Sequence, residues 1–94
     1  KNTVHTLEIT RRLPEVVALG YPVLAAVSNK DFVGESLGRP RGERLSGSLA
    51  VATVSAMLGA RIVRMHDVAE SVDAMRMVEA TLGWRTPVES RHNT

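Results

Sequence analysis

Pro22-Val-Leu-Ala-Ala-Val27, followed at once by the polar run Ser28-Asn-Lys-Asp31, is the stretch that decides the fold. It is short and apolar along its whole length, which is typical of a parallel strand buried on both faces. A second stretch of the same kind, Arg61-Ile-Val-Arg-Met65, ends at His66-Asp67. We therefore predict two short strands, each buried on both faces and each followed by polar residues.

The segment before the first strand has the pattern of a helix with a break in it. Thr3 is a suitable N-cap residue, and Gly20 is a typical helix stop. The apolar positions between them recur at roughly helical spacing: Leu7, Leu13, Val16 and Val17. Pro14 lies inside this stretch and predicts a kink or a break there.

The segment between the two strands divides into a loop and a helix. Residues 32–45 hold three glycines and a proline, so we predict a loop. Ser46 can cap a helix that runs to about Leu58 and is ended by Gly59. The second strand therefore follows a crossover helix.

A last helix follows the second strand. Asp67 and Glu70 have the spacing of a capping box, and Gly83 closes the helix. The apolar stripe of this helix is expected to consist of Val72, Met75, Val78 and Leu82. Residues 85–94 are expected to form a polar, frayed tail.

The order helix, strand, helix, strand, helix favours a parallel sheet with crossover helices, that is, an α/β fold. Two strands do not make a stable sheet core by themselves, so further strands must lie upstream or come from another chain. A (β/α)8 TIM barrel of about 250 residues would accommodate this chain as its last two and a half units. We thus expect residues 1–84 to be the C-terminal part of a barrel domain.

Composition excludes several classes of function. The chain of 94 residues has no cysteine, which rules out disulfides, zinc–thiolate centres and cysteine nucleophiles. Its net charge of +2 comes from 12 basic and 10 acidic residues, too even a balance to predict nucleic-acid binding. Without a signal peptide or a long apolar run, we expect a cytoplasmic protein with no membrane partner.

Candidate binding residues lie where the two strands end. Ser28 and Lys30 are two positions apart and project to the same side of an extended chain, and Arg64 and His66 repeat that spacing. Because parallel α/β folds build their sites at the carboxyl ends of strands, we expect these four side chains around one mouth. Two cations and an imidazole there would suit a phosphate, a diphosphate or a polar heterocycle.

Each of these residues also has a plainer interpretation. Lys30 could be a solvated loop residue, Ser28 a turn or cap residue, and His66 a local hydrogen-bonding group. Arg64 needs a partner, which Asp67 or Glu70 could supply. A solvated loop explains three further arginines, Arg39, Arg41 and Arg44, and packing explains four methionines, Met57, Met65, Met75 and Met77.

Three motifs in order resemble the dihydropteroate synthase family. The stretch from Pro22 to Gly34 resembles its seventh strand and the following loop, and Glu43-Arg-Leu-Ser-Gly-Ser-Leu-Ala50 resembles its seventh helix. Ile62-Val-Arg-Met-His-Asp-Val68 is similar to its eighth strand. Lys1 matches the lysine that closes a Gly-Phe-Gly-Lys type motif after the sixth strand, and His5 also fits the pattern.

The resemblance implies a transferase activity. The family joins 4-aminobenzoate to 6-hydroxymethyl-7,8-dihydropterin diphosphate and releases pyrophosphate, in folate synthesis. By position, Lys30 would hydrogen-bond the pterin, Arg64 and His66 would hold the diphosphate, and Ser28 would lie by the aminobenzoate. The resemblance also implies a homodimer and Mg²⁺ at the diphosphate, with the metal contacts upstream of this chain. The chain alone is therefore not expected to be active.

Two positions depart from the family pattern Ser-Arg-Lys-Ser. Asn29 replaces a guanidinium, and Asp31 replaces a hydroxyl near the expected position of the aminobenzoate carboxylate. Two carboxylates in contact repel each other by about 1 kcal/mol even in water. Because the variant resembles divergent actinobacterial paralogues, one alternative is an inactive paralogue that binds a pterin or phosphate ligand or has a dimeric structural role. A further alternative is an unrelated oxyanion-binding α/β module.

Overall fold

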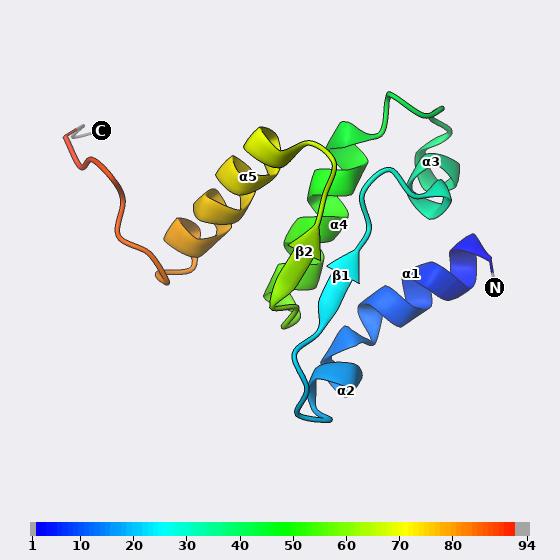
Figure 1. Cartoon of the computed structure of the whole chain (residues 1–94), viewed down its shortest axis with the longest axis horizontal. Coiled ribbons are helices and arrows are strands. Elements are labelled where there is room, and N and C mark those ends of the chain that lie inside the picture. Colours follow the sequence, from blue (N-terminus) through cyan, green and yellow to red (C-terminus); the bar gives the residue numbers. More distant parts are fainter. Residues whose placement is uncertain (1, 92–94) are drawn as a thin grey trace.

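The computed structural model describes residues 2–91 and has the order α1(Thr3–Arg11), α2(Leu13–Val17), β1(Leu24–Ala26), α3(Asp31–Leu37), α4(Leu45–Met57), β2(Ile62–Arg64) and α5(Val68–Thr81). The two strands lie side by side and parallel, with α4 behind them (Figure 1). Ala25 pairs with Val63 in the register. The predicted α/β order is present, and Lys1 and residues 92–94 lie outside the described residues.

The sheet is covered on one face rather than on two as predicted. Ala25 and Val27 are buried, whereas Leu24 and Ile62, which pair in the register and point the other way, are each 53% exposed. Helices α3 and α4 pack on the buried side. Within residues 2–91 there is no third strand and no other layer to cover the opposite face, so the apolar side chains there remain exposed.

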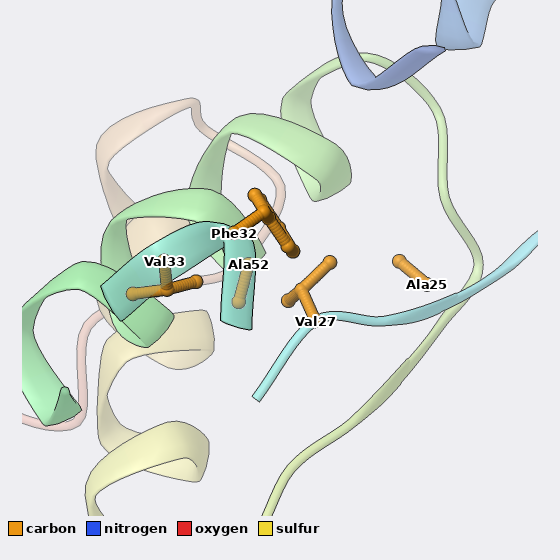
Figure 2. Packing of buried hydrophobic residues seen from close by; sticks show 5 residues of the cluster. All are labelled: Ala25, Val27, Phe32, Val33 and Ala52. Atoms are coloured by element: carbon orange, nitrogen blue, oxygen red, sulfur yellow. The ribbon is translucent and has the colours of Figure 1, made fainter. Parts of the chain in front are cut away.

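The core joins the buried side of β1 to helices α3 and α4. Figure 2 shows Ala25, Val27, Phe32, Val33 and Ala52 gathered between these elements, and Ala52 is completely buried. Phe32 and Val33 belong to α3, so the prediction of a loop over residues 32–45 was wrong for its first half. Their burial against β1 stabilises a short helix despite the glycine next to them.

The first helix is broken as Pro14 predicts. Arg12 separates α1 from α2, and Pro14 lies in the first turn of α2, where a missing N–H costs nothing. Arg12 donates two hydrogen bonds to the Glu15 carboxylate, at 2.8 and 2.9 Å, and these lower the pKa of Glu15 from its ordinary value. The N-cap is Asn2 rather than Thr3, because the Asn2 Oδ1 accepts a hydrogen bond from the His5 N–H at 3.0 Å.

Two other predicted caps are wrong in detail. Helix α4 begins one residue before Ser46, with Arg44 at the N-cap and no side chain capping it. Asp67 is the N-cap of α5, but its side chain makes no capping bond, so the expected capping box does not form. The Ser71 hydroxyl donates to the Asp67 carbonyl at 2.6 Å, a bond one turn back along the chain that uses none of the groups of a capping box.

The last described residues follow α5. Residues 85–91 contain no helix or strand, and Arg85 donates to the Glu79 carboxylate at 3.0 Å, which ties the start of this segment to α5. None of the helices in the described part of the chain is both long and apolar enough to cross a membrane.

Gly47 allows α4 to pack closely on α3, which yields a test of the fold. A Cβ at Gly47 would lie 2.6 Å from the Val33 Cγ1 and 2.8 Å from the Leu37 Cδ1. We expect Gly47→Val to destabilise the intact protein by about 2 kcal/mol through overpacking. Thermal unfolding measures the change, with Ser46→Ala as the neighbouring control, expected within about 0.5 kcal/mol. Equal melting of both variants would contradict the close contact.

Candidate functional site

A cavity of about 370 Å³ opens where β1 and β2 end. Its polar lining consists of Ser28, Asn29, Lys30, Arg41, Arg64 and His66. The first three follow β1, and Arg64 and His66 stand at the end of β2 and just beyond it. The structure thus brings together five of the six residues that the sequence singled out, and it places Asp31 outside this cavity.

Ser28 connects the ends of the two strands. Its side chain is 4% exposed, and its Oγ accepts a hydrogen bond from the His66 backbone N–H at 3.1 Å. The same Oγ lies 2.9 Å from the His66 Nδ1. One hydroxyl therefore fixes both the backbone and the ring of His66, so Ser28 is more than the turn residue that its type suggests.

Lys30 stands at the point where β1 gives way to α3. Its backbone is extended, with φ −76° and ψ 156°, and it forms the N-cap of α3. Its side chain is exposed and borders both the strand-end cavity and a second, larger one of about 580 Å³ beside α1. Lys30 can therefore reach a ligand in either space.

Arg64 has no carboxylate partner among residues 2–91. The ion pairs of this part of the chain do not include Arg64, so neither Asp67 nor Glu70 neutralises it as the plainer interpretation required. Arg64 is the last residue of β2 and is exposed on the cavity side. An exposed guanidinium at a strand end is available to an anion from solution.

Asn29 holds the turn after β1 in an unusual conformation. Its φ of 56° lies in the left-handed region, which asparagine tolerates better than most residues. Its N–H donates to the Ser48 Oγ at 2.9 Å, and Ser48 is almost completely buried. The Asn29 Oδ1 is buried and has no hydrogen-bond partner among the described residues.

Asp31 faces the second cavity. It lines the space beside α1 together with Lys30 and Glu35, and its carboxylate is 72% exposed. The Asp31 Oδ1 lies 3.3 Å from the Arg44 Nη1 and 3.9 Å from the Arg41 Nη2. Both arginines reduce the field of the Asp31 carboxylate, although neither removes it.

Arg44 is a structural residue that sequence reasoning missed. Its side chain is only 11% exposed, and its Nε donates to the Arg39 carbonyl at 3.0 Å. Its Nη1 lies 3.4 Å from the carbonyls of both Asn29 and Lys30. A Cβ at Gly34 would lie 2.3 Å from the guanidinium, so the glycine provides the space for Arg44. Because Gly34 was interpreted as a loop residue, the local sequence pattern did not indicate this contact.

Arg41 lies in a solvated loop, as the sequence indicated, and its side chain is 76% exposed. The sequence did not indicate that it also lines the strand-end cavity with Lys30 and Arg64. Three cationic side chains and His66 therefore surround this cavity, no carboxylate among the described residues lines it, and Asp31 lies 3.9 Å from Arg41 outside it. Such a group of donors can bind a multiply charged oxyanion. Within residues 2–91, no three acidic or histidine side chains gather as metal ligands.

Comparison with known proteins shows which family the sequence matches. Residues 1–66 match the model of the family described as "Pterin binding enzyme". The chain is 49% identical over 82 residues to the dihydropteroate synthase of Escherichia coli, which covers 87% of this chain and 29% of that protein. It is 44% identical over 90 residues to "Inactive dihydropteroate synthase 2" of Mycobacterium tuberculosis, which covers 96% of this chain and 28% of that protein.

Solved structures agree with the family match. The Yersinia pestis dihydropteroate synthase superposes with a TM-score of 0.84 at 42% identity, covering 88% of this chain and 34% of that one. The Xanthomonas albilineans enzyme, in complex with 7,8-dihydropteroate, gives 0.85 at 38% identity, covering 93% and 33%. The chain therefore spans about a third of the length of these relatives and matches part of their TIM barrel.

The carbonyl contacts of Arg44 give a testable role. We expect Arg44→Lys to destabilise the intact protein by about 1–3 kcal/mol, because lysine keeps the charge but cannot bridge the carbonyls that the guanidinium joins. Hydrogen exchange should become faster over residues 29–34. Arg39→Lys is the control, since its side chain forms only an exposed pair with Glu43 at 3.5 Å. Unchanged hydrogen exchange in Arg44→Lys would refute the role of Arg44 in bridging these carbonyls.

Proposed function

The chain belongs to the pterin-binding enzyme family, and from that premise we propose that the protein containing it is a dihydropteroate synthase. It would condense 6-hydroxymethyl-7,8-dihydropterin diphosphate with 4-aminobenzoate and release pyrophosphate. The single observation that supports this most is the shared cavity of Ser28, Lys30, Arg64 and His66 at the carboxyl ends of β1 and β2. A family match alone does not supply that geometry.

The reaction needs charge stabilisation at the leaving group. The amine nitrogen of 4-aminobenzoate forms a bond to the pterin methylene carbon, and the bond from that carbon to the diphosphate oxygen breaks. The electron pair leaves with the diphosphate, and the amine proton passes to solvent. We assign Arg64 and His66 to the departing diphosphate, where preorganised donors stabilise the developing charge. The Ser28 hydroxyl keeps the His66 ring in place for this role.

The other substrates are assigned by position. Lys30 would hydrogen-bond the pterin, because its ammonium group borders both cavities. We place 4-aminobenzoate next to Asp31, in the space beside α1. When bound, Mg²⁺ would neutralise charge on the diphosphate, and we propose that the rest of the protein supplies its contacts. We also propose a homodimer, to which the exposed apolar residues Met57 and Met77 can contribute.

A second candidate function is a family member that binds pterin diphosphate without turnover. The similarity to an inactive synthase 2 favours it, and so does Asp31. A carboxylate that is 72% exposed in the second cavity would repel the carboxylate of 4-aminobenzoate. The cations that line the strand-end cavity, Lys30, Arg41 and Arg64, would remain in place to bind the diphosphate.

A coupled assay of the full-length protein separates the two candidates. Dihydropterin diphosphate and 4-aminobenzoate are supplied with Mg²⁺, and pteroate and pyrophosphate are both measured. Formation of both products supports the synthase. Calorimetric binding of the pterin diphosphate with no product supports the second candidate and refutes the synthase. A protein that neither binds nor turns over these compounds refutes both.

Lys30 and Arg64 carry the next prediction. We expect Lys30→Ala and Arg64→Ala each to weaken binding of dihydropterin diphosphate by about tenfold or more, because each loses a charge-assisted hydrogen bond. Isothermal titration calorimetry measures the affinity. Arg61→Ala is the matched control, since Arg61 precedes β2 and lies at the opposite end of the strand from the cavity. Affinities equal to that of the control would refute the assignment.

Asp31 carries a separate prediction. We expect Asp31→Ser to strengthen 4-aminobenzoate binding about three- to fivefold, measured with the pterin site saturated. The gain is limited because Arg44 and Arg41 already reduce the field of Asp31. Glu35→Gln is the control for a general loss of negative charge, since Glu35 lines the same cavity. No gain in affinity in Asp31→Ser, or an equal gain in both variants, would contradict a specific repulsion between the carboxylates of Asp31 and 4-aminobenzoate.

A further inference from the structure

The loop between α3 and α4 carries a cation into the strand-end cavity. Arg41 lies in this loop, 11 positions after Lys30 in the sequence, yet both side chains line the same space. Arg41 lies neither in a strand nor directly after one. Its presence there requires the loop to fold back over the end of β1.

The backbone explains how the loop folds back. The Glu43 N–H donates to the Pro40 carbonyl at 3.1 Å, which closes a tight turn with Arg41 and Gly42 at its tip. Gly42 has a φ of 89°, a value that the third position of such a turn requires and that glycine adopts without strain. Arg44 then holds the base of the turn through its bonds to the carbonyls of Arg39 and Asn29. The turn is therefore anchored beside the cavity.

The charges around Arg41 are unbalanced. Its one ion pair among the described residues is with Asp31, at 3.9 Å, and both side chains are more than 70% exposed. Asp31 lies closer to Arg44, at 3.3 Å, so Arg41 has only a share of one carboxylate. Lys30 and Arg64 line the same cavity and repel it. A polyanion in the cavity would relieve this repulsion and compete with Asp31 for the Arg41 guanidinium.

We propose that Arg41 is a third cationic ligand for the diphosphate, delivered by the α3–α4 turn rather than by a strand end. The proposal rests on the proposed function, because that function makes a diphosphate the occupant of the cavity. In the unliganded protein Arg41 pairs with Asp31, and in the complex its planar guanidinium turns to two oxygens of the diphosphate. Asp31 thus competes with the diphosphate for the Arg41 guanidinium, and its carboxylate also lines the second cavity.

The test uses inorganic pyrophosphate as the probe and the full-length protein with Mg²⁺. We expect Arg41→Ala to weaken pyrophosphate binding in calorimetry about tenfold, and Arg41→Lys to weaken it less, about threefold, because lysine keeps the charge and loses the fork geometry. Arg39→Ala is the matched control from the same loop, because the Arg39 side chain pairs with Glu43 and does not line the cavity. Its affinity should equal that of the unmodified protein.

A second comparison tests the competition with Asp31. Asp31→Asn should strengthen pyrophosphate binding in the natural background and do so less in Arg41→Ala. An equal gain in both backgrounds would show that Asp31 acts on other cations, and it would overturn the competition. Thermal melting of every variant within a degree or two of the parent excludes a general loss of structure.

The outcomes distinguish this inference from the function that it builds on. If Arg64→Ala weakens pyrophosphate binding while Arg41→Ala and Arg39→Ala both leave it unchanged, the role of Arg41 is refuted and the proposed function stands. If pyrophosphate binding depends on Arg41 but no pteroate forms, the synthase is refuted and the role of Arg41 stands. If the unmodified protein does not bind pyrophosphate, the inference is overturned as well.

Discussion

The hydrogen bonds of the Ser28 hydroxyl to His66 hold the site together. They join the end of β1 to the end of β2 across 38 residues of sequence, at 3.1 Å to the backbone and 2.9 Å to the ring. The parallel register places Ala26 opposite Arg64, so the residues that follow each strand leave the sheet at the same level. A one-residue slip would turn Arg64 to the other face of the sheet and separate it from Lys30. The position of the cations therefore depends on the strand pairing that Ser28 closes.

Burial on one side of the sheet explains why so short a pair of strands can hold this geometry. Val33 and Ala52 pack under β1 and are almost completely buried, and they fix the strand against α3 and α4. The other face carries Leu24 and Ile62 half exposed to solvent. The family relatives are about three times longer than this chain, and their barrel offers an interior for such a face. The candidate site therefore lies at the edge of an apolar sheet face that the described residues leave uncovered.

The sequence could predict the strand-end residues because their geometry follows from local periodicity. An apolar run followed by polar residues at alternate positions already places Ser28 and Lys30 on one side, and a second run does the same for Arg64 and His66. The contributions of Arg41 and Arg44 depend on a turn and on contacts across 13 to 15 residues, for which no local pattern exists. Helix α3 was missed because its glycine was weighed as a loop signal, whereas the burial of Phe32 decides the structure. The caps predicted for α1 and α4 were wrong because both helices begin earlier than expected: Asn2 caps α1 in place of Thr3, and α4 begins before Ser46.

The charges are distributed unequally between the two cavities. Lys30 stands between two cavities of different character. The strand-end cavity is lined by cations from three separate segments, so a single substitution in one of them leaves the others in place. The cavity beside α1 contains two carboxylates, Asp31 and Glu35, and Lys30 is its one cationic group among the described residues. A hydroxyl at position 31 would leave a single carboxylate there, whereas the aspartate adds a second one, whose field Arg44 and Arg41 reduce. Under the proposed function, the diphosphate and the aromatic carboxylate would therefore occupy separate cavities, and Asp31 would act on the first through Arg41 and on the second by repulsion.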